Sequence, residues 1–429
     1  MVYWLDTSEA DFETKFQAFL SLKREVSVDV DKAVADIIND VRDRGHAAVA
    51  AYTKRFDHLE IGSTARFSDA EIAAAVAAVD AEDRAALEIA ISRVRAFHER
   101  QRPQDEGYTD EVGVELGWRW TSVSAAGIYV PGGQAAYPSS VYMNAIPASV
   151  AGVPRIAMCV PTPHGEANPL VLTAAHLCGV TEIYRIGGAQ AVAALAYGTE
   201  DVAPVDKIVG PGNAFVAAAK RRVFGQVGID MIAGPSEILV VADKDNDPAW
   251  IAADLLSQAE HDADAQSILI TDNKPFAQAV EQAVEAQLKT LPRAEIAGAS
   301  WRNNGGIVLV DDVSTCEALI DRLAPEHLEI ATEDPKQLFA KIRNAGSAFL
   351  GRFTPEPMGD YIAGPNHVLP TARAARYASG LGVLDFMKRT TFLGLSPDAL
   401  AELGAPARRL AEAEGLGAHA RAIAIRGNR

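Results

Sequence analysis

Short apolar runs that end at glycine or proline alternate with alanine-rich stretches over much of the chain. Four such runs lie at 126–133, 155–163, 182–188 and 207–213. Between them are segments such as NPLVLTAAHLCGV and AQAVAALAYG, which have the composition of helices. A strand, a Gly/Pro turn, a helix and another strand in succession are typical of a parallel sheet with crossover helices.

A second set of apolar runs predicts another sheet of the same kind. These runs lie at 237–243, 267–271, 305–312, 327–332 and 347–351. The segments WIAADLLSQAEHD and CEALIDRLA, between pairs of these strands, are predicted helices. We therefore predict two α/β units, one inside roughly 130–236 and the other built from segments on both sides of it.

Helical periodicity dominates the two ends of the chain. Residues 28–56 and 69–101 carry apolar positions near helical spacing; the first pattern stops at Gly45, and the second opens with a cap at Ser68 or Asp69. Residues 396–429 are also predicted to be helical. This tail is too short for a core of its own, so we expect it to pack on something else, such as a partner chain.

Composition narrows the class of protein. The 429 residues are 48% hydrophobic and 23% charged, which is ordinary for a soluble globular enzyme. A net charge of −17 repels phosphate backbones, so we expect no nucleic-acid partner. Three cysteines without a CxxC pair, Cys159, Cys178 and Cys316, suggest a reducing compartment. With no secretory signal and no apolar run of 18 residues, a cytoplasmic protein without membrane association is expected.

Glycine-rich turns are candidates for a nucleotide site. No GxGxxG follows the first strand, but PGG (131–133), IGGAQ (186–190) and VGPGNAF (209–215) each follow a predicted strand. Open α/β sheets bind ligands at the carboxyl ends of their strands, where glycine lets backbone N–H groups approach a pyrophosphate. One such turn is usually a plain connection. Three in one unit fit a nucleotide site and plain turns equally well.

Candidate metal ligands occur in three motifs. Gln258 and His261 in SQAEHDADAQ are three residues apart, so both project from one face of a helix. They could form half of a metal site, although glutamine is a weak ligand and a polar helix end explains the pair as well. Further donors are available in two motifs: Asp360 and His367 in MGDYIAGPNHVLPT, and Glu414 and His419 in EGLGAH.

The segment APEHLEI (324–330) places an acid, Glu326, directly beside an imidazole, His327. It is not a zinc-protease helix, because no second histidine follows at helical spacing. Both residues lie in the turn before a predicted strand.

Taken together, the motifs resemble the histidinol dehydrogenase family, from YTKRFD (52–57) to EGLGAHARA (414–422). The most specific matches, all in the same order, are GIYVPGGQAAYPSSVYMNAIPA, KIVGPGNAFVAAAK, VGIDMIAGPSEILVVAD, LLSQAEHDADAQ, APEHLEI and GDYIAGPNHVLPT. The segment SAAGIYV lacks a basic residue sometimes seen just before the glycine, which we regard as surface variation.

The resemblance implies zinc-dependent oxidation of L-histidinol through L-histidinal to L-histidine, with two NAD+ used at one site. It implies that the metal ligands are Gln258, His261, Asp360 and His419, the last from the other subunit of a homodimer. Besides these ligands, it implies that the substrate contacts are Ser236, His327, His367 and Glu414. The implied cofactor contacts are Tyr129, Gln190 and Asn213.

The resemblance also implies a fold of two incomplete Rossmann-like parallel-sheet domains, with small helical terminal segments that intertwine the homodimer. We accordingly expect four parts: an N-terminal helical segment at 1–25, a first, discontinuous Rossmann-like domain at 26–129 plus 237–381, a second Rossmann-like domain at 130–236, and a C-terminal helical dimerisation tail at 382–429.

Two oxidations at one site need two kinds of base catalysis. A neutral imidazole suits removal of the hydroxyl proton, which we assign to His327. The aldehyde must then be hydrated, and the carboxylate of Glu326 is the natural base for the attacking water. Zinc would mainly hold the imidazole and amine of the substrate, and Glu414 would hydrogen-bond the far imidazole nitrogen.

Three alternative functions are weighed against this one. A related zinc- and NAD-dependent dehydrogenase could act on another hydroxylated substrate, such as a sulfonated diol; Glu414 and His367, which would recognise an imidazole, argue against it. A zinc hydrolase in which Glu326 activates water does not need the glycine-rich turns. A catalytically silent zinc-binding dimer would not need the Glu326–His327 pair.

Overall fold

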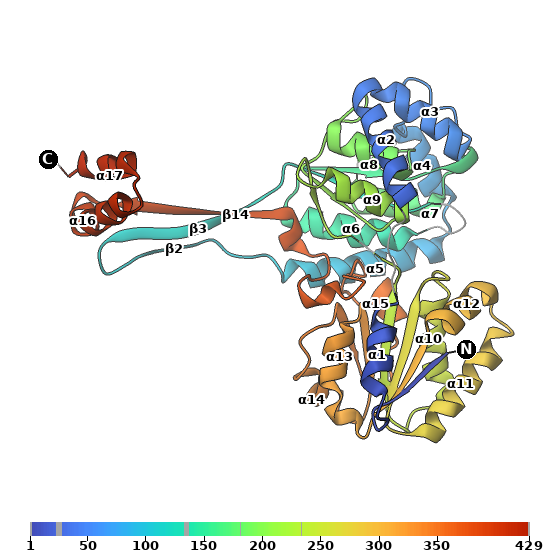
Figure 1. Ribbon diagram of the computed structural model, residues 1–429. Coiled ribbons are helices and arrows are strands. Elements are labelled where there is room, and N and C mark those ends of the chain that lie inside the picture. The colour runs from blue at the N-terminus through green and yellow to red at the C-terminus, as the bar shows by residue number, and fades with distance from the viewer. Residues whose placement is uncertain (1, 23–27, 133–136, 181, 233, 428–429) are drawn as a thin grey trace.

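Two parallel sheets and one antiparallel ribbon organise the chain in the computed structural model (Figure 1). The structure describes residues 2–22, 28–132, 137–180, 182–232 and 234–427. Gly133 of the predicted PGG turn and the end of the predicted segment 1–25 lie outside these residues. The predicted α/β class with two parallel sheets is confirmed.

The larger sheet has six parallel strands. In spatial order they are β1 (Tyr3–Asp6), β11 (Gly306–Leu309), β10 (Gln266–Thr271), β9 (Glu237–Ala242), β12 (His327–Ala331) and β13 (Ser347–Leu350). Its helices are α1 (Phe12–Leu20), α10 (Pro248–Ala259), α11 (Lys274–Leu288), α12 (Ala294–Asn304), α13 (Glu317–Leu323) and α14 (Pro335–Phe339). All residues of β9 are buried, and alternate side chains point to opposite faces of the sheet. Ile238 and Val240 belong to one apolar cluster, and Leu239 and Val241 belong to another. Burial on both faces explains why this strand is a continuous apolar run.

The smaller sheet has five parallel strands. In spatial order they are β6 (Glu182–Tyr184), β5 (Arg155–Cys159), β4 (Ala125–Tyr129), β7 (Lys207–Val209) and β8 (Gly228–Ile229). Its crossover helices are α6 (Pro138–Ala151), α7 (Pro169–Leu177), α8 (Gly188–Tyr197) and α9 (Ala214–Val223). The order of the strands reverses between β4 and β7, which is the position where open α/β sheets bind ligands.

The two long helical stretches predicted near the N-terminus are each divided in two. The helices are α2 (Val28–Arg44), α3 (His46–Asp57), α4 (Asp69–Ala78) and α5 (Ala81–Glu99). Gly45, with φ of +53°, separates the first pair, and the Asp80 side chain caps α5 by accepting hydrogen bonds from the Glu82 and Asp83 backbone N–H groups. The predicted cap at Ser68 is present as a reciprocal capping box with Glu71.

These four helices pack on the smaller sheet, which corrects the expected membership of residues 26–129 in the domain with 237–381. Helix α2 contacts α8 and α9, and α5 contacts α6. Ile37 and Val41 of α2 share an apolar cluster with Tyr129 of β4. The expected N-terminal helical segment also needs correction, because it begins with β1, an edge strand of the larger sheet. An amphipathic helix fits any apolar face, so its periodicity does not say which sheet it covers.

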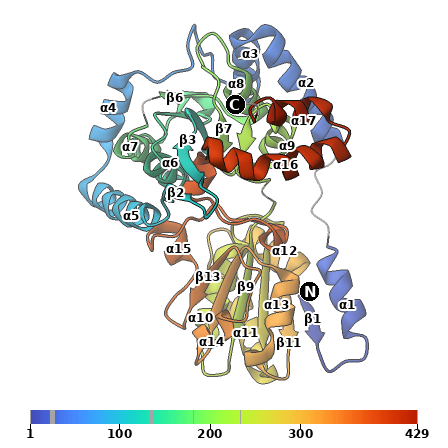
Figure 2. The same cartoon turned by 90° about the vertical axis from the view of Figure 1, so that its left-hand side faces the viewer.

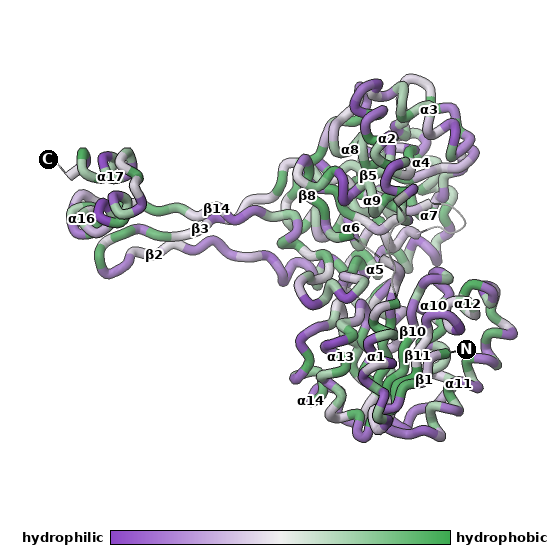
Figure 3. Tube along the Cα trace, in the orientation of Figure 1, coloured by the Kyte–Doolittle hydropathy of each residue, from purple (hydrophilic) through white to green (hydrophobic). Residues whose placement is uncertain are grey.

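An arm extends from the body of the molecule (Figures 1 and 2). Its antiparallel strands are β2 (Glu106–Thr109), β3 (Val114–Ser122) and β14 (Met387–Leu395), and its end carries α16 (Pro397–Ala413) and α17 (Gly417–Ala424). Helices predicted within 396–429 are therefore present, whereas the expected helical tail at 382–429 includes a nine-residue strand. Hydrophobic residues continue along the arm (Figure 3), among them Leu393 and Leu410, each 67% exposed. No helix in the described part of the chain is both long and apolar enough to cross a lipid bilayer.

Candidate active site

The predicted catalytic, metal and substrate residues of the body lie near the place where the two sheet-containing lobes meet. A short helix, α15 (Pro357–Tyr361), and the loop after it lie between the lobes in Figure 1. The loop is fixed to α6 of the smaller lobe: Tyr142 Oη donates to the Tyr361 carbonyl at 2.8 Å, and Asn366 Nδ2 donates to the Met143 carbonyl at 2.5 Å. These hydrogen bonds hold the loop in place between the two lobes.

Glu326 and His327 are both held by the backbone of one residue, Glu237. The Glu237 N–H donates to Glu326 Oε2 at 2.9 Å, and His327 Nδ1 donates to the Glu237 carbonyl at 3.0 Å. Glu326 is 5% exposed and His327 3%. These contacts form at the amino ends of the neighbouring strands β9 and β12, where the strand order of the larger sheet reverses. Because the hydrogen bond occupies Nδ1, the free lone pair of a neutral His327 is on Nε2.

His327 Nε2 faces two further carboxylates. Glu356 Oε1 and Asp360 Oδ1 each lie 3.6 Å from it, and ligand atoms of the three residues lie within 4.8 Å of one another. Burial alone would lower the pKa of His327, but the charges of Glu326, Asp360 and Glu356 outweigh it and raise the pKa to about 10. Burial raises the pKa of Glu356, and likewise that of Glu326, to about 8. The cluster can therefore hold a proton or a cation at its centre.

Glu356 was not among the predicted site residues. It is 1% exposed and lies four residues before Asp360. The spacing puts the two carboxylates on one helical face, a signal that the sequence TPEPMGD carries but that its prolines obscure. Glu237 was not predicted either, because its backbone rather than its side chain holds Glu326 and His327.

Gln258, at the end of α10, has an atom that fits a metal. Its side chain is fully buried, and its Nε2 lies 3.0 Å from His261 Nδ1. Its Oε1 is buried and has no hydrogen-bond partner in the residues that the structure describes. The adjacent Ser257 Oγ donates to Glu356 Oε2 at 3.2 Å, which ties this helix end to the carboxylate cluster. An unpartnered amide oxygen beside an imidazole and carboxylates is a donor set that a zinc ion could use.

Two predicted substrate contacts lie at the edges of this cluster. His367 Nδ1 donates to the Asp360 carbonyl at 3.0 Å, which leaves its Nε2 for another partner. Burial lowers the pKa of His367, so its ring is neutral. Ser236 directly precedes Glu237 and accepts a hydrogen bond from the Gln266 N–H at 3.0 Å through its carbonyl. Both residues are thus near the Glu326–His327 pair.

Glu414 and His419 do not join the other candidates within one chain. Both are exposed, and both belong to the helical end of the arm, which Figure 1 shows far from the body. A site that uses them must take them from a second chain.

The predicted cofactor residues lie at the carboxyl edge of the smaller sheet. Tyr129 ends β4, and its Oη accepts a hydrogen bond from the Gly188 N–H at 3.1 Å. Asn213 caps α9 by accepting from the Phe215 and Val216 N–H groups. Gln190, in α8, is 1% exposed, and its Oε1 lacks a hydrogen-bond partner among the residues described. Tyr129, Gln190 and Asn213 therefore lie along one edge, with the N-termini of α8 and α9 directed at it.

Gly210 shows how closely two of these strands meet. Its φ is +117°, and a Cβ at this position would collide with the Tyr129 carbonyl oxygen. Only glycine fits here. The close approach falls between β4 and β7, where the strand order reverses.

Comparison with known proteins gives the same result by each route. The family model described as histidinol dehydrogenase matches residues 21–427. The histidinol dehydrogenase of Ruegeria pomeroyi is 61% identical over 427 residues, which cover 99% of this chain and 99% of that relative. The histidinol dehydrogenase of Rhizobium meliloti is 63% identical over 426 residues, which cover 99% of this chain and 98% of that relative. The crystal structure of histidinol dehydrogenase from Elizabethkingia anophelis superposes with a TM-score of 0.94 at 37% identity, over 99% of this chain and 98% of that one. This chain belongs to the histidinol dehydrogenase family.

Proposed function

We propose that this oxidoreductase of histidine biosynthesis converts L-histidinol through L-histidinal to L-histidine, using two NAD+ and one zinc ion per subunit. The observation that carries the proposal is the buried Glu326–His327 pair, held on Glu237 beside the unpartnered Gln258 oxygen. Family membership supports the substrate. Three free, buried cysteines and the acidic surface support a reducing, cytoplasmic setting without a nucleic-acid partner.

In the first oxidation His327 is the general base. Its Nδ1 donates to the Glu237 carbonyl, so Nε2 is free to take the hydroxyl proton of histidinol. At the same time, hydride leaves the carbon that bears this hydroxyl for the nicotinamide. The fixed ring orientation keeps Nε2 directed at the site. General-base help of this kind contributes about 10²–10⁴-fold.

In the second oxidation Glu326 acts first. Its carboxylate takes a proton from water while the water oxygen attacks the aldehyde carbon, which gives the gem-diol. His327, once it has released its first proton to solvent, accepts a hydroxyl proton of the gem-diol as the second hydride leaves for the second NAD+, and the acid forms. Glu326 Oε2 accepts from the Glu237 N–H and lies 3.7 Å from His327 Nδ1, so Oε1 is the oxygen that would take the proton from water.

The metal site that we propose comprises Gln258, His261, Asp360 and the partner subunit's His419. When bound there, zinc would hold the imidazole and amine nitrogens of the substrate and offset the carboxylate charge that raises the His327 pKa. His367 and Ser236 would contact the substrate from the body. Glu414 of the partner subunit would hydrogen-bond its far imidazole nitrogen.

The proposed NAD+ site is the carboxyl edge of the smaller sheet. Tyr129, Gln190 and Asn213 would contact the dinucleotide, with the unpartnered Gln190 Oε1 as an acceptor. The N-termini of α8 and α9 would favour the negative charge of the pyrophosphate.

The proposed assembly is a homodimer in which each arm completes the site of the other chain. Support comes from the arm itself, whose exposed apolar residues need a cover, and from the exposure of Glu414 and His419 at its end.

The test is NADH formation from L-histidinol before and after treatment with a chelator. We expect two NADH per histidinol, loss of activity on chelation and recovery with zinc. If histidinol gives no NADH but another hydroxylated compound, such as a sulfonated diol, is oxidised, the related dehydrogenase activity replaces this proposal.

A further inference from the structure

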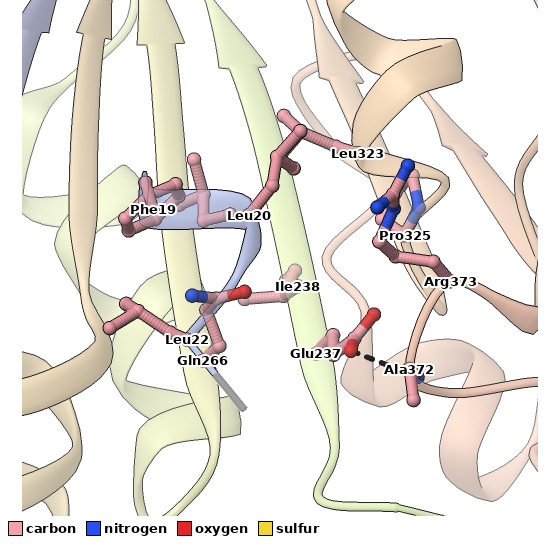
Figure 4. Close-up of a pocket in the computed structure, with 11 residues that line it drawn as sticks. Phe19, Leu20, Leu22, Glu237, Ile238, Gln266, Leu323, Pro325, Ala372 and Arg373 are labelled. Carbon is pink, nitrogen blue, oxygen red and sulfur yellow. Dashed lines mark hydrogen bonds between the residues drawn. The ribbon is translucent and has the colours of Figure 1, made fainter. Parts of the chain in front are cut away.

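A cavity of about 170 Å³ is lined by Glu237, the residue whose backbone holds Glu326 and His327 (Figure 4). It opens between α1 and the amino ends of β9 and β10. Apolar side chains form most of its wall, among them Phe19, Leu20, Ile238 and Leu323. The two charged side chains in the wall, those of Glu237 and Arg373, lie on the same side of the cavity. None of the functions proposed above uses this space.

Arg373 brings an unsatisfied donor to the cavity. Its Nε is buried and has no hydrogen-bond partner in the part of the chain that the structure describes. A guanidinium group has five N–H donors and accepts no hydrogen bonds, so only an acceptor can satisfy this atom. Burial lowers the pKa of Arg373, the positive charges of Arg376 and Arg322 lower it further, and the Glu237 carboxylate raises it. Three guanidinium groups therefore face one carboxylate in this corner, and the excess of positive charge favours an anion.

The backbone around the cavity is strained. Ala324, Ala372 and Arg373 have φ of +46°, +52° and +64°, and the described residues contain only two other non-glycine residues with positive φ. Ala372 and Arg373 line the cavity, and Ala324 lies between two lining residues, Leu323 and Pro325. Left-handed conformations of non-glycine residues concentrate at ligand sites and switches. Here they hold the Arg373 side chain against the cavity.

The same loop is joined to the catalytic pair through Glu237. The Glu237 carboxylate accepts a hydrogen bond from the Ala372 N–H at 3.0 Å (dashed in Figure 4). The Glu237 backbone holds Glu326 and His327. Ala372 directly precedes Arg373 and is hydrogen-bonded to Glu237. A ligand that moves Arg373 can therefore act through Ala372 and Glu237 on Glu326 and His327.

We propose that this cavity binds a small organic anion, a carboxylate on an apolar body, and that its occupation changes the turnover rate of the enzyme. The carboxylate accepts hydrogen bonds from Arg373, and the apolar body packs against Phe19, Leu20 and Leu323. A cavity of about 150 Å³ holds a molecule of the size of benzene, which sets the size of the body. The effect on turnover rests on the proposed function, whereas binding does not.

Titration calorimetry on the full-length protein with benzoate tests the binding. Benzamidine has the same shape and the opposite charge, so we expect it to bind at least about tenfold more weakly. Arg373→Gln should weaken benzoate binding by about tenfold or more, and the control Arg343→Gln, at an exposed arginine outside the cavity wall, should leave it within about twofold. Leu20→Trp fills the cavity without changing charge and should abolish binding.

Two further measurements separate this cavity from the active site. Saturating L-histidinol should leave benzoate binding unchanged, and benzoate should alter kcat for histidinol while leaving KM in place. Equal affinity for benzoate and benzamidine, benzoate binding that survives both Arg373→Gln and Leu20→Trp, or displacement of benzoate by histidinol would overturn the proposal. If the protein does not oxidise histidinol, the calorimetric results still decide whether the cavity is an anion site.

Discussion

At the scale of single residues, the charge around His327 decides what the site can do. Neighbouring carboxylates raise its pKa to about 10, which favours the protonated ring, and a positive charge beside Asp360 would oppose this effect. A divalent cation would do this, which links loading of the metal to the basicity of His327. In the sequence, Glu326 and His327 are candidates because they are adjacent. The sequence did not identify Glu356, because burial and contact with His327 come from folding and not from local pattern.

Glu326→Gln separates the two oxidations. The amide keeps the shape and the acceptor oxygen for the Glu237 N–H, but it is no longer a base for water. We expect the aldehyde step to slow by about 10²–10⁴-fold and the alcohol step to change far less. In a single-turnover experiment the first NADH per site should form quickly and the second slowly. Equal slowing of both phases would contradict the division of roles, and Glu333→Gln, with a side chain 91% exposed, is the control.

Gln258→Leu tests whether the unpartnered amide oxygen holds the metal. The side chain is similar in size and fully buried, so packing changes little, but the oxygen ligand is lost. We expect zinc content, measured by atomic emission after dialysis, to fall well below one per subunit. Gln282→Leu, at an exposed position on α11, should keep full zinc content. Unchanged zinc in the Gln258 variant would remove this residue from the proposed ligand set.

At the scale of elements, nine of the eleven parallel strands in the described residues were predicted, whereas β1, β8 and the strands of the arm were not. A strand buried on both faces leaves an unbroken apolar run such as 238–242, which makes it easy to predict. The ribbon strand β3 has another pattern, with Val114, Leu116, Trp118 and Trp120 alternating with other residues. That alternation is itself a strand signal, so β3 was within reach of the sequence although it was not predicted.

The turn between β7 and α9 depends on a buried ion pair. Lys220 Nζ donates to the Gly210 carbonyl at 2.9 Å and pairs with Asp230, which in turn accepts from the Gly210 N–H at 2.8 Å. Lys220→Met leaves a buried carboxylate without its partner, which distorts the turn before Asn213. We expect KM for NAD+ to rise by about tenfold with zinc content unchanged. Arg221→Met, the exposed neighbour on the same helix, should leave KM alone; an unchanged KM for the Lys220 variant would refute the link.

The capping box of α4 gives a pH-dependent prediction. Hydrogen bonds from the Ser68 backbone, and then from Arg185, lower the pKa of Glu71 to about 2 from an ordinary value of 4.5. A lowered carboxyl pKa stabilises the fold above pH 4.5, and this contribution is lost as the pH falls from 4.5 towards 2. Glu71→Gln should therefore melt below the wild type at pH 7, and the difference should shrink at pH 3. A difference that is the same at both pH values would show that the charge of Glu71 is not its cause.

At the scale of the whole molecule, the sequence could not say which sheet the helices of residues 28–99 cover. Their apolar faces would fit either lobe, and only the packed structure assigns them to the smaller one. For the arm, the sequence likewise does not say which surface its apolar residues cover, and that surface can belong to a second chain. The arm's exposed leucines and its distance from the body are explained if a second chain receives it, and the proposed ligand His419 then reaches a site that its own chain does not complete.

Mixed dimers test this sharing of sites. A His419→Ala chain lacks the arm ligand, and a Glu326→Gln chain lacks a base in the body, so each variant alone should have little activity. After subunit exchange, half of the dimers are hybrids, and one of the two sites in each hybrid combines a normal body with a normal arm. Activity should therefore recover to about a quarter of the wild-type value. His419→Ala mixed with an arm variant at Glu414 should not recover, because both lesions then affect the same part of the chain. If hybrids containing Glu326→Gln also stay inactive, each chain builds its site alone and the arm has another purpose.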